Sequence, residues 1–317
     1  MIEMGATKTI LAPLSGCSDL AFRLVSREAG AGLCFFEMIS ARSLIYNNPR
    51  LKETLKTHAD DQPIAAQLLG HEPEILLKAA RELLRRASVS FIDINSACPA
   101  KKVTSKKAGA HLLKKPEILK SIIETLASAL EIPVTVKIRL GDIAIDREES
   151  ARLAADCEAA GASAIFVHGR SRAQGYDGEV DHAGIRAVKE AVKIPVIGSG
   201  DIFHGPAAKK MIEKTGCDRV LAARGAMGNP WIFREIEEYL ASGRIIPRPS
   251  REERKAALAK HLSYAERHRG GDSPGKVGFM RKVTVWYLRG LPGAGELRRR
   301  VYQAGSYGEL MKMAEGI

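Results

Sequence analysis

One repeat constrains the fold of this sequence more than any other feature. Short apolar runs rich in β-branched residues recur roughly every 25 to 40 residues, and each is followed by a segment with helical periodicity. Such alternation is typical of strand–helix units that build a parallel sheet. Eight strands are predicted in this way, at 9–12, 33–38, 64–69, 91–95, 134–138, 164–168, 196–199 and 219–223.

Eight parallel strands that alternate with helices close most economically into a barrel. A doubly wound sheet, the alternative, would carry a G-x-G-x-x-G turn after its first strand, and the chain has none there. The sequence therefore predicts an α/β fold, a (β/α)₈ TIM barrel. Helices are predicted at 74–86, 116–130 and 150–160, the second opened by Pro116 and the third closed by Gly161.

The C-terminal part of the chain differs from the rest in pattern and in charge. At 244–250 the sequence RIIPRPS breaks the periodicity, and the residues beyond it have helical pattern without β-rich runs. Residues 243–317 hold 16 Lys and Arg against 7 Asp and Glu, which is +9 of the net charge of +12. We predict a barrel over 1–242 and a small all-helical domain over 243–317 that binds a polyanion such as RNA; a solvated basic helix face is the alternative.

Composition excludes several other classes of protein. No apolar run approaches the roughly 20 residues that cross a bilayer, and the N-terminus does not resemble a signal peptide, so a cytoplasmic protein without membrane contact is expected. The cysteines form no C-x-x-C pair, which argues against zinc and against a disulfide framework. Four of them, Cys17, Cys34, Cys157 and Cys217, are expected to be small buried residues.

In a TIM barrel the functional residues follow the strands, at their carboxyl ends. Small residues after the last two strands, together with Arg224, predict a phosphate site. Lys137 should point into the barrel mouth, where a buried ammonium needs an anion; a flavin would supply one, and an ion pair with Glu37 or Asp93 is the alternative. The strand-end residues are Pro13, Leu14, Ser15, Gln67, Asn95, Cys98, Lys137, Arg139, His168, Arg170, Ser199, Gly200, Asp201, Ala223 and Arg224.

Nine segments of the chain, spread over both predicted domains, resemble the tRNA-dihydrouridine synthase family. The matching segments occur in the family's order along nearly the whole chain. They are LAPLSGCSDLAFR at 11–23, EMISA at 37–41, QLLG at 67–70, IDINSACPAKKV at 92–103, VKIRLG at 136–141, HGRSRAQGYDG at 168–178, GSGDI at 198–202, ARGAMGNPWIF at 223–233 and FMRKVTVWYLRG at 279–290.

The resemblance implies an enzyme that reduces uridine in tRNA to 5,6-dihydrouridine, with FMN as cofactor and NADPH as reductant. Hydride would pass from flavin N5 to uracil C6, and Cys98 would give the proton to C5 of a uridine flipped out of the RNA. The implied substrate contacts are Asn95, Arg170, Tyr176, Arg281 and Lys282. The implied FMN contacts are Pro13, Leu14, Ser15, Gln67, Lys137, His168, Ser199, Gly200, Asp201, Ala223 and Arg224.

Some positions depart from the family pattern. The chain has Ser96 and Ala97 where the family usually has Met-Gly, Ser199 in place of Asn, and Ala223 in place of Gly. Because Ser199 offers fewer hydrogen bonds and the Ala223 methyl crowds the phosphate loop, weaker FMN retention is expected. The same chemistry on ribosomal RNA, a non-catalytic RNA-binding relative and a small-molecule flavin reductase remain alternatives. No obligate protein partner is expected.

Overall fold

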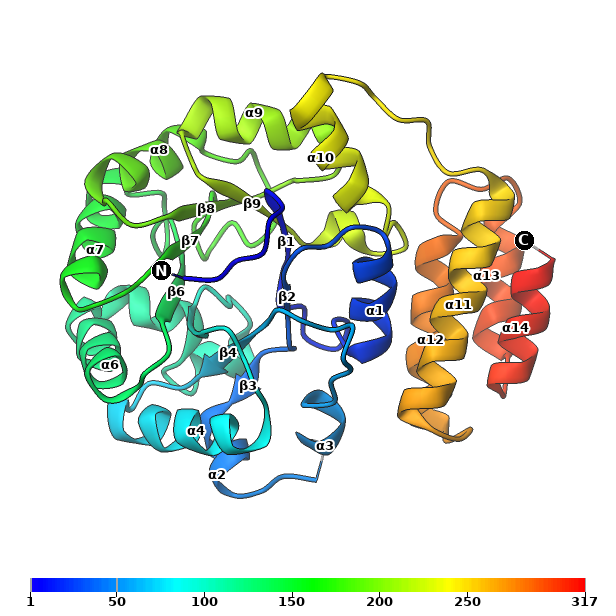
Figure 1. Ribbon diagram of the computed structural model, residues 1–317, viewed down its shortest axis with the longest axis horizontal. Helices are drawn as coiled ribbons and strands as arrows, with labels where there is room; N and C mark the ends of the chain where they lie inside the picture. The colour runs from blue at the N-terminus through cyan, green and yellow to red at the C-terminus, as the bar shows by residue number, and fades with distance from the viewer. Residues whose placement is uncertain (1, 50, 317) are drawn as a thin grey trace.

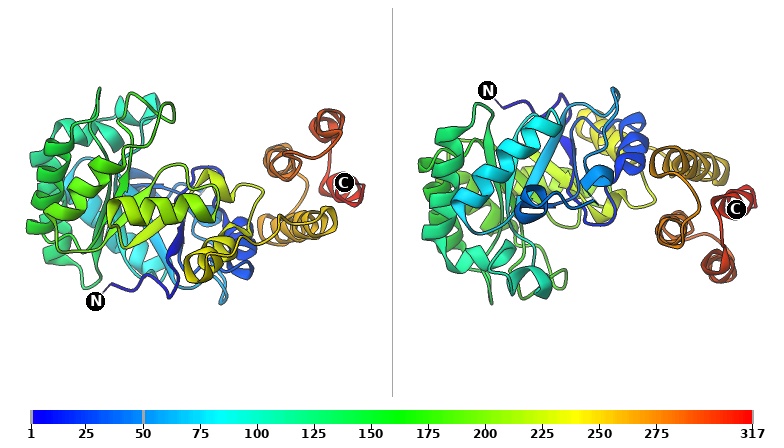
Figure 2. Two further views of the ribbon diagram at one scale, coloured as in Figure 1. Left: turned by 90° about the horizontal axis from the view of Figure 1, so that it is seen from above. Right: turned by 90° about the horizontal axis from the view of Figure 1, so that it is seen from below.

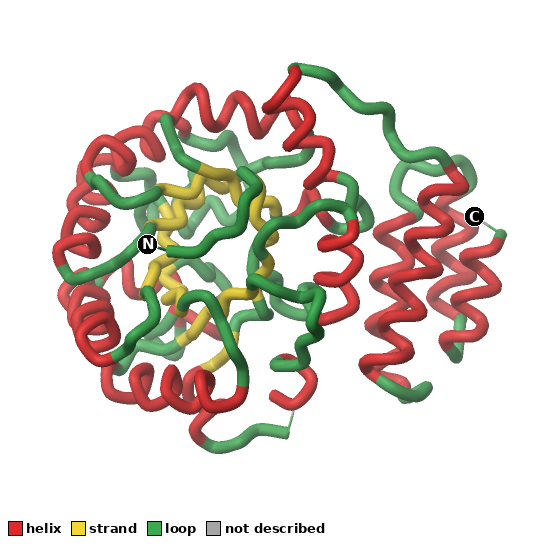
Figure 3. Tube along the Cα trace, in the orientation of Figure 1, coloured by secondary structure: helices red, strands yellow, loops and turns green. Residues whose placement is uncertain are grey.

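The computed structural model describes residues 2–49 and 51–316. Its parallel strands form one sheet that curls into a ring, with helices around the outside (Figures 1 and 3). The strand order is β1-β9-β8-β7-β6-β5-β4-β2, and β3 also pairs with β4. A parallel bridge between Ile10 and Leu33 joins the two ends of the sheet. The predicted TIM barrel is therefore confirmed.

Seven of the predicted strands agree with the structure to within one residue at each end, and the second is split. Two residues of β4 stand opposite the three residues 36–38, which makes a β-bulge between β2 and β3. The bulge turns Met38 towards the barrel mouth. The strands are β1 (Thr9–Leu11), β2 (Cys34–Phe35), β3 (Ile39–Ser40), β4 (Ile64–Leu69), β5 (Ile92–Ser96), β6 (Val134–Arg139), β7 (Ile165–His168), β8 (Val196–Ser199) and β9 (Arg219–Ala222).

The three predicted barrel helices are α4 (Pro73–Arg86), α6 (Pro116–Ala129) and α7 (Arg147–Ala159). The last begins three residues before its predicted start, because the Asp146 side chain accepts a hydrogen bond from the Glu149 N–H and caps the helix. No described helix is long and apolar enough to span a membrane. The other elements around the barrel are α1 (Leu20–Glu28), α2 (Ala41–Ile45), α3 (Leu51–Thr54), α5 (Lys101–Thr104), η1 (Gly109–Lys114), α8 (His182–Ala191), α9 (Gly205–Thr215), η2 (Arg224–Ala226) and α10 (Ile232–Ser242).

The interior of the barrel is filled by side chains and is not a pore. The rings of Phe35, Phe91 and Phe166 pack together with centroids 5.5 to 6.2 Å apart. Above them Asp93 accepts hydrogen bonds of 2.7 Å from Gln67 and Thr135. Burial raises the pKa of Asp93 to about 6. This floor limits the functional pocket to the carboxyl ends of the strands.

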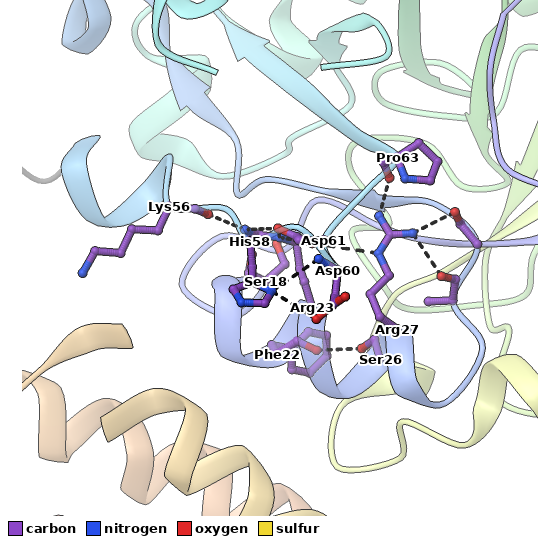
Figure 4. A network of polar contacts seen from close by, with 12 residues as sticks. Ser18, Phe22, Arg23, Ser26, Arg27, Lys56, His58, Asp60, Asp61 and Pro63 are labelled. Atoms are coloured by element: carbon purple, nitrogen blue, oxygen red, sulfur yellow. Dashed lines mark hydrogen bonds and ion pairs between the residues drawn. The ribbon is translucent and has the colours of Figure 1, made fainter. Parts of the chain in front are cut away.

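A buried ion pair fastens α1 to the segment before β4 (Figure 4). The guanidinium of Arg23 donates to both oxygens of Asp61 and to the carbonyls of Ser18 and Lys56, at 2.7 to 3.2 Å. Both side chains are completely shielded from solvent. Arg23 also lies over the ring of Phe36, 4.9 Å from its centroid. Every nitrogen of this buried cation is thus satisfied.

Four further helices form a group to one side of the barrel, and the first of them packs against α1 (Figures 1 and 2). Residues 243–250 join them to α10 without regular structure. Arg269 forms an ion pair of 2.8 Å with Asp19, and the Trp286 ring meets the edge of Phe22. The division into two domains at residue 243 stays a prediction. The helices are α11 (Arg251–Arg269), α12 (Pro274–Tyr287), α13 (Ala294–Gln303) and α14 (Tyr307–Glu315).

Candidate active site

A pocket of about 260 Å³ opens at the carboxyl ends of the barrel strands, and we call it the mouth pocket. Side chains alternate between the two faces of each strand, so residues two apart share a face. Strand register then sets Asn95 beside Lys137 and His168 beside Ser199. The mouth pocket is lined by fourteen predicted site residues: Pro13, Leu14, Ser15, Gln67, Asn95, Cys98, Lys137, His168, Tyr176, Ser199, Gly200, Asp201, Ala223 and Arg224.

Lys137 is a cation without an anion in this pocket. Within residues 2–49 and 51–316 its ammonium makes no ion pair, so the alternative pairing with Glu37 or Asp93 is not found. Burial, assisted by the neighbouring charge of Arg139, lowers the pKa of Lys137 from 10.5 to about 8. A buried ammonium is stabilised by a negative partner, and the pocket has room for one.

His168 also has an unused polar atom. Its Nδ1 lies 3.2 Å from the hydroxyl of Ser199, while Nε2 is buried and has no partner among the described residues. Burial, followed by the charges of Lys137 and Arg139, lowers the pKa of His168 well below 6.5, so the ring is neutral at pH 7. A buried nitrogen of this kind is usually satisfied by a ligand or water.

The predicted phosphate loop lies at the ends of β8 and β9. Asp201 has a positive φ of 51°, and its carboxylate accepts hydrogen bonds from Arg170 and Arg224. The guanidinium of Arg224 stacks over the ring of Tyr176 at 4.5 Å and over that of Phe203 at 5.5 Å. Arg224 is therefore held in place at the pocket wall while its side chain stays 38% exposed. Such a preorganised cation can receive a phosphate.

The loop that carries Cys98 is held by hydrogen bonds on both sides. The Oδ1 atom of Asn95 accepts from the N–H groups of Ala97 at 3.1 Å and Cys98 at 2.9 Å. Its Nδ2 donates to Gln67 at 2.7 Å. Arg139 donates to the Ala97 carbonyl at 2.8 Å. Asn95 thus orients Cys98, and its contact with a uracil stays a prediction.

The remaining predicted substrate residues lie outside the mouth pocket. Arg170 is only 2% exposed and binds Asp201 and the carbonyl of Gly178. Arg281 donates to the Ala304 carbonyl at 2.7 Å, inside the C-terminal helices. These contacts give both arginines a structural role, and their contact with RNA remains a prediction.

Lys282 reaches from α12 to the loop after β1. Its ammonium donates to the Gly16 carbonyl at 2.5 Å and lies 3.8 Å from the sulfur of Cys17. The N–H of the same residue, Gly16, donates to Glu37. The C-terminal helices therefore help to hold the loop from Leu14 to Cys17 that lines the mouth pocket.

The departures from the family pattern occupy different surroundings. The Ser96 hydroxyl is completely buried and has no partner among the described residues. Ser199 is engaged with His168, and the Ala223 side chain lines the mouth pocket. The unpartnered hydroxyl of Ser96 costs hydrogen-bond energy in the folded protein. Ser199 and Ala223, in contrast, lie where FMN is predicted to bind.

Some lining residues were given no role by the sequence interpretation of the site. Arg139 was identified as a strand-end residue without a function; it follows Lys137 by two residues, and so it shares its face and lines the pocket. Cys17 is half-buried and lines the pocket, unlike the buried Cys34, Cys157 and Cys217. Phe203 lies beyond the strand end, where no periodicity marks it. No cluster of three or more His, Cys, Asp or Glu suited to a metal occurs in the described part of the chain.

Comparison with known proteins gives a consistent result. The family model described as Dihydrouridine synthase (Dus) matches residues 10–315. The chain is 40% identical to tRNA-dihydrouridine synthase B of Pseudomonas aeruginosa, over 92% of this chain and 86% of that protein. It is 38% identical to a probable tRNA-dihydrouridine synthase of Rickettsia conorii, over 95% and 91% of the two chains.

Solved structures agree on the fold alone. Morphinone reductase, in complex with tetrahydroNAD, aligns with a TM-score of 0.54 at 14% identity, over 79% of this chain and 90% of that one. The family match spans nearly all of the barrel and the C-terminal helices, and it includes every strand end that lines the mouth pocket. The chain therefore belongs to the dihydrouridine synthase family.

Proposed function

We propose that this protein is an FMN-dependent tRNA-dihydrouridine synthase that reduces uridine to 5,6-dihydrouridine with NADPH. One observation carries the proposal: an unpaired lysine, Lys137, and an unpartnered buried nitrogen of His168 line the same pocket as the thiol of Cys98. Such a set is costly for folding and has a purpose only when a ligand completes it. Its membership of the family and the names of its relatives support the same activity.

The residues present fit a flavin mononucleotide. Lys137 would supply the positive charge beside the anionic edge of the reduced ring, and His168 Nε2 would form the hydrogen bond that it lacks. Arg224, held by Asp201, would neutralise the phosphate. When bound, FMN would supply the hydride that is added to C6 of the uracil.

Cys98 would complete the reduction. After hydride addition the negative charge lies at C5 and O4 of the uracil, and the S–H bond of Cys98 would break to form the C5–H bond. Asn95 fixes the backbone at Cys98 through two accepted hydrogen bonds, so the thiol is held in one place. The resulting thiolate would lie in the same pocket as the side chains of Lys137 and Arg139.

The RNA would reach the pocket by base flipping. A stacked uridine cannot enter a recess at the end of a barrel, so the nucleotide must leave the helix. Tyr176 is 53% exposed at the rim and offers an aromatic face to the flipped or the adjacent base. The +9 charge of residues 243–317 would offset the cost of flipping through phosphate contacts. The relatives' names favour tRNA over ribosomal RNA; the enzyme would act in the cytoplasm without a protein partner.

The test is the Cys98→Ala variant in a reaction with FMN-loaded enzyme, NADPH and an unmodified tRNA transcript. Dihydrouridine, measured by nucleoside mass spectrometry, should fall by about 100-fold or more, which is the usual loss for a general acid. Reduction of the bound flavin by NADPH should keep its rate. Cys157→Ala, which removes a buried thiol of α7, is the matched control and should retain full activity. An active Cys98→Ala enzyme would remove Cys98 as the acid.

A further inference from the structure

A second recess, of about 540 Å³, lies between the barrel and the C-terminal helices, and we call it the linker cleft. Barrel residues from Phe203 to Pro206 and from Arg224 to Glu235 line one side. Residues of α11 and α12 line the other side, and linker residues 245–249 form a further wall. Figure 1 shows this linker passing from the end of α10 to the start of α11. A volume of this size suits a small organic ligand.

The linker cleft has an excess of positive charge. Arg234, Arg248 and Arg289 are exposed, and their guanidinium groups form no ion pair and donate no hydrogen bond within the described parts of the chain, 2–49 and 51–316. Hydrogen bonds with Ser250, followed by the charge of Arg234, lower the pKa of Glu253. The two acids of the cleft are already used at helix starts. Glu235 accepts from the Gly205 N–H at the start of α9, and Glu253 accepts from the Ser250 N–H at the start of α11. The arginines of the cleft outnumber these two acids, so the cleft favours an anionic ligand.

The cleft also offers flat apolar surface. Its lining includes Trp231 and the apolar linker residue Ile246. Trp286 also lines it, but this residue is only 8% exposed and its ring packs against Phe22 and Lys282. Trp231 and Ile246 are both half-buried, so part of each faces the cleft. Aromatic rings beside unpaired arginines are suited to a ligand that combines a base with phosphate groups.

The linker cleft is continuous with the mouth pocket. Phe203, Arg224 and Gly225 line both recesses. The Phe203 ring is 39% exposed, and the Arg224 guanidinium lies over it. A ligand with two ends could therefore place one in the mouth pocket and the other in the linker cleft.

We propose that the linker cleft binds the adenosine phosphate end of the nicotinamide dinucleotide reductant, with its 2′-phosphate at Arg234, Arg248 and Arg289. This inference rests on the proposed function, which requires such a reductant, and it predicts a preference for the 2′-phosphorylated form over the unphosphorylated one. RNA fits less well. An RNA strand continues in both directions and needs a groove that is open at both ends, whereas residues 245–249 of the linker line one side of this cleft. A dinucleotide, in contrast, could end inside the cleft.

The test uses adenosine 2′,5′-bisphosphate as probe for the FMN-loaded protein. Because the half-buried Trp231 lines the cleft, intrinsic fluorescence should change saturably as the probe binds. The double variant Arg248→Ala/Arg289→Ala should weaken this binding by about tenfold or more, as expected for lost charge-assisted hydrogen bonds. The control Arg299→Ala/Lys312→Ala removes the same charge from exposed positions of α13 and α14 and should change the affinity less than twofold.

Two further measurements decide between the ligands. Adenosine 5′-monophosphate should bind at least about tenfold more weakly than the bisphosphate, because it lacks the 2′-phosphate. A single-stranded oligoribonucleotide should bind the double variant as tightly as it binds the charge-matched control. The inference is overturned if the probe does not bind, or if the double variant loses affinity for the oligonucleotide and not for the bisphosphate. Neither binding result depends on whether uridine is reduced, so failure of the proposed function would be seen separately.

Discussion

Two groups of charged and polar side chains differ in whether the protein supplies their hydrogen-bond and ion-pair partners. At α1, Arg23 is matched by Asp61 and by two carbonyls, and no nitrogen of its guanidinium is left over. At the barrel mouth, Lys137 is unpaired and His168 keeps a nitrogen free, within the residues that the structure describes. A buried ion pair with all its hydrogen bonds made indicates a structural role. A set of side chains that lines a pocket and lacks such partners indicates a ligand-binding role. At the mouth pocket, the unsatisfied groups of Lys137 and His168 lie beside space for a ligand.

Removal of the Asp61 carboxylate would leave Arg23 without its ion-pair partner. Asp61→Ala leaves a fully buried guanidinium without its carboxylate, and we expect a loss of about 3 to 5 kcal/mol in the free energy of unfolding. Urea denaturation measures it. Asp60→Ala is the matched control: its carboxylate is 80% exposed and pairs with His58 at the surface, so the change should stay within about 0.5 kcal/mol. Equal effects of the two variants would contradict the structural role of Arg23.

Removal of the unpaired charge of Lys137 should have the opposite effect on stability. Lys137→Met should stabilise the flavin-free protein at pH 7 by about 1 to 3 kcal/mol, because it deletes a partly buried cation of which the pKa is lowered to about 8. The same variant should retain little FMN after purification. Urea denaturation of the apoprotein and the absorbance of the bound flavin measure the two effects. A variant that is destabilised like Asp61→Ala would show that Lys137 serves the fold instead.

The stability difference between Lys137→Met and the parent apoprotein should decrease as the pH rises. Lys137 binds its proton less tightly in the folded state than in the unfolded state, where its pKa is 10.5. Its cost to folding is therefore complete below pH 8 and disappears as the pH rises from 8 to 10.5. The stability advantage of Lys137→Met over the parent apoprotein should shrink across that window. A constant difference from pH 7 to 10.5 would exclude this titration.

The smallest effect concerns the residues that depart from the family at the flavin. Ser199→Asn combined with Ala223→Gly should raise the fraction of purified protein that carries FMN by about twofold to fivefold, which corresponds to roughly 0.4 to 1 kcal/mol. Absorbance of the flavin relative to protein measures it. The parent protein with a full complement of FMN would contradict the expectation of weak retention.

Periodicity explains why so much of the barrel could be predicted. Apolar runs marked seven strands to within one residue, and strand ends then brought fourteen predicted residues into one pocket. The bulge beside Met38 could not be foreseen, because it arises from the pairing of two distant strands and leaves no local pattern. The same holds for the contact of Lys282 with Gly16, which is set by the packing of α12 on the barrel; the predicted contact of Lys282 with RNA stays a prediction.

The residues around Cys98 show a further limit. The sequence marks Asn95 as a polar residue at a strand end, and that is where it lies. Its hydrogen bonds go to the backbone at Ala97 and Cys98, because the loop turns back over the end of β5. Only the folded loop reveals that Asn95 holds the proposed acid in place.

Nucleoside mass spectrometry of tRNA from cells with and without this gene tests the proposed activity most directly. Deletion should abolish dihydrouridine at one or more tRNA positions, and the gene supplied in trans should restore it, whereas its Cys98→Ala form should not. Ribosomal RNA from the same cells distinguishes the alternative substrate. If dihydrouridine is unchanged in both tRNA and ribosomal RNA, the mouth pocket serves some other reaction.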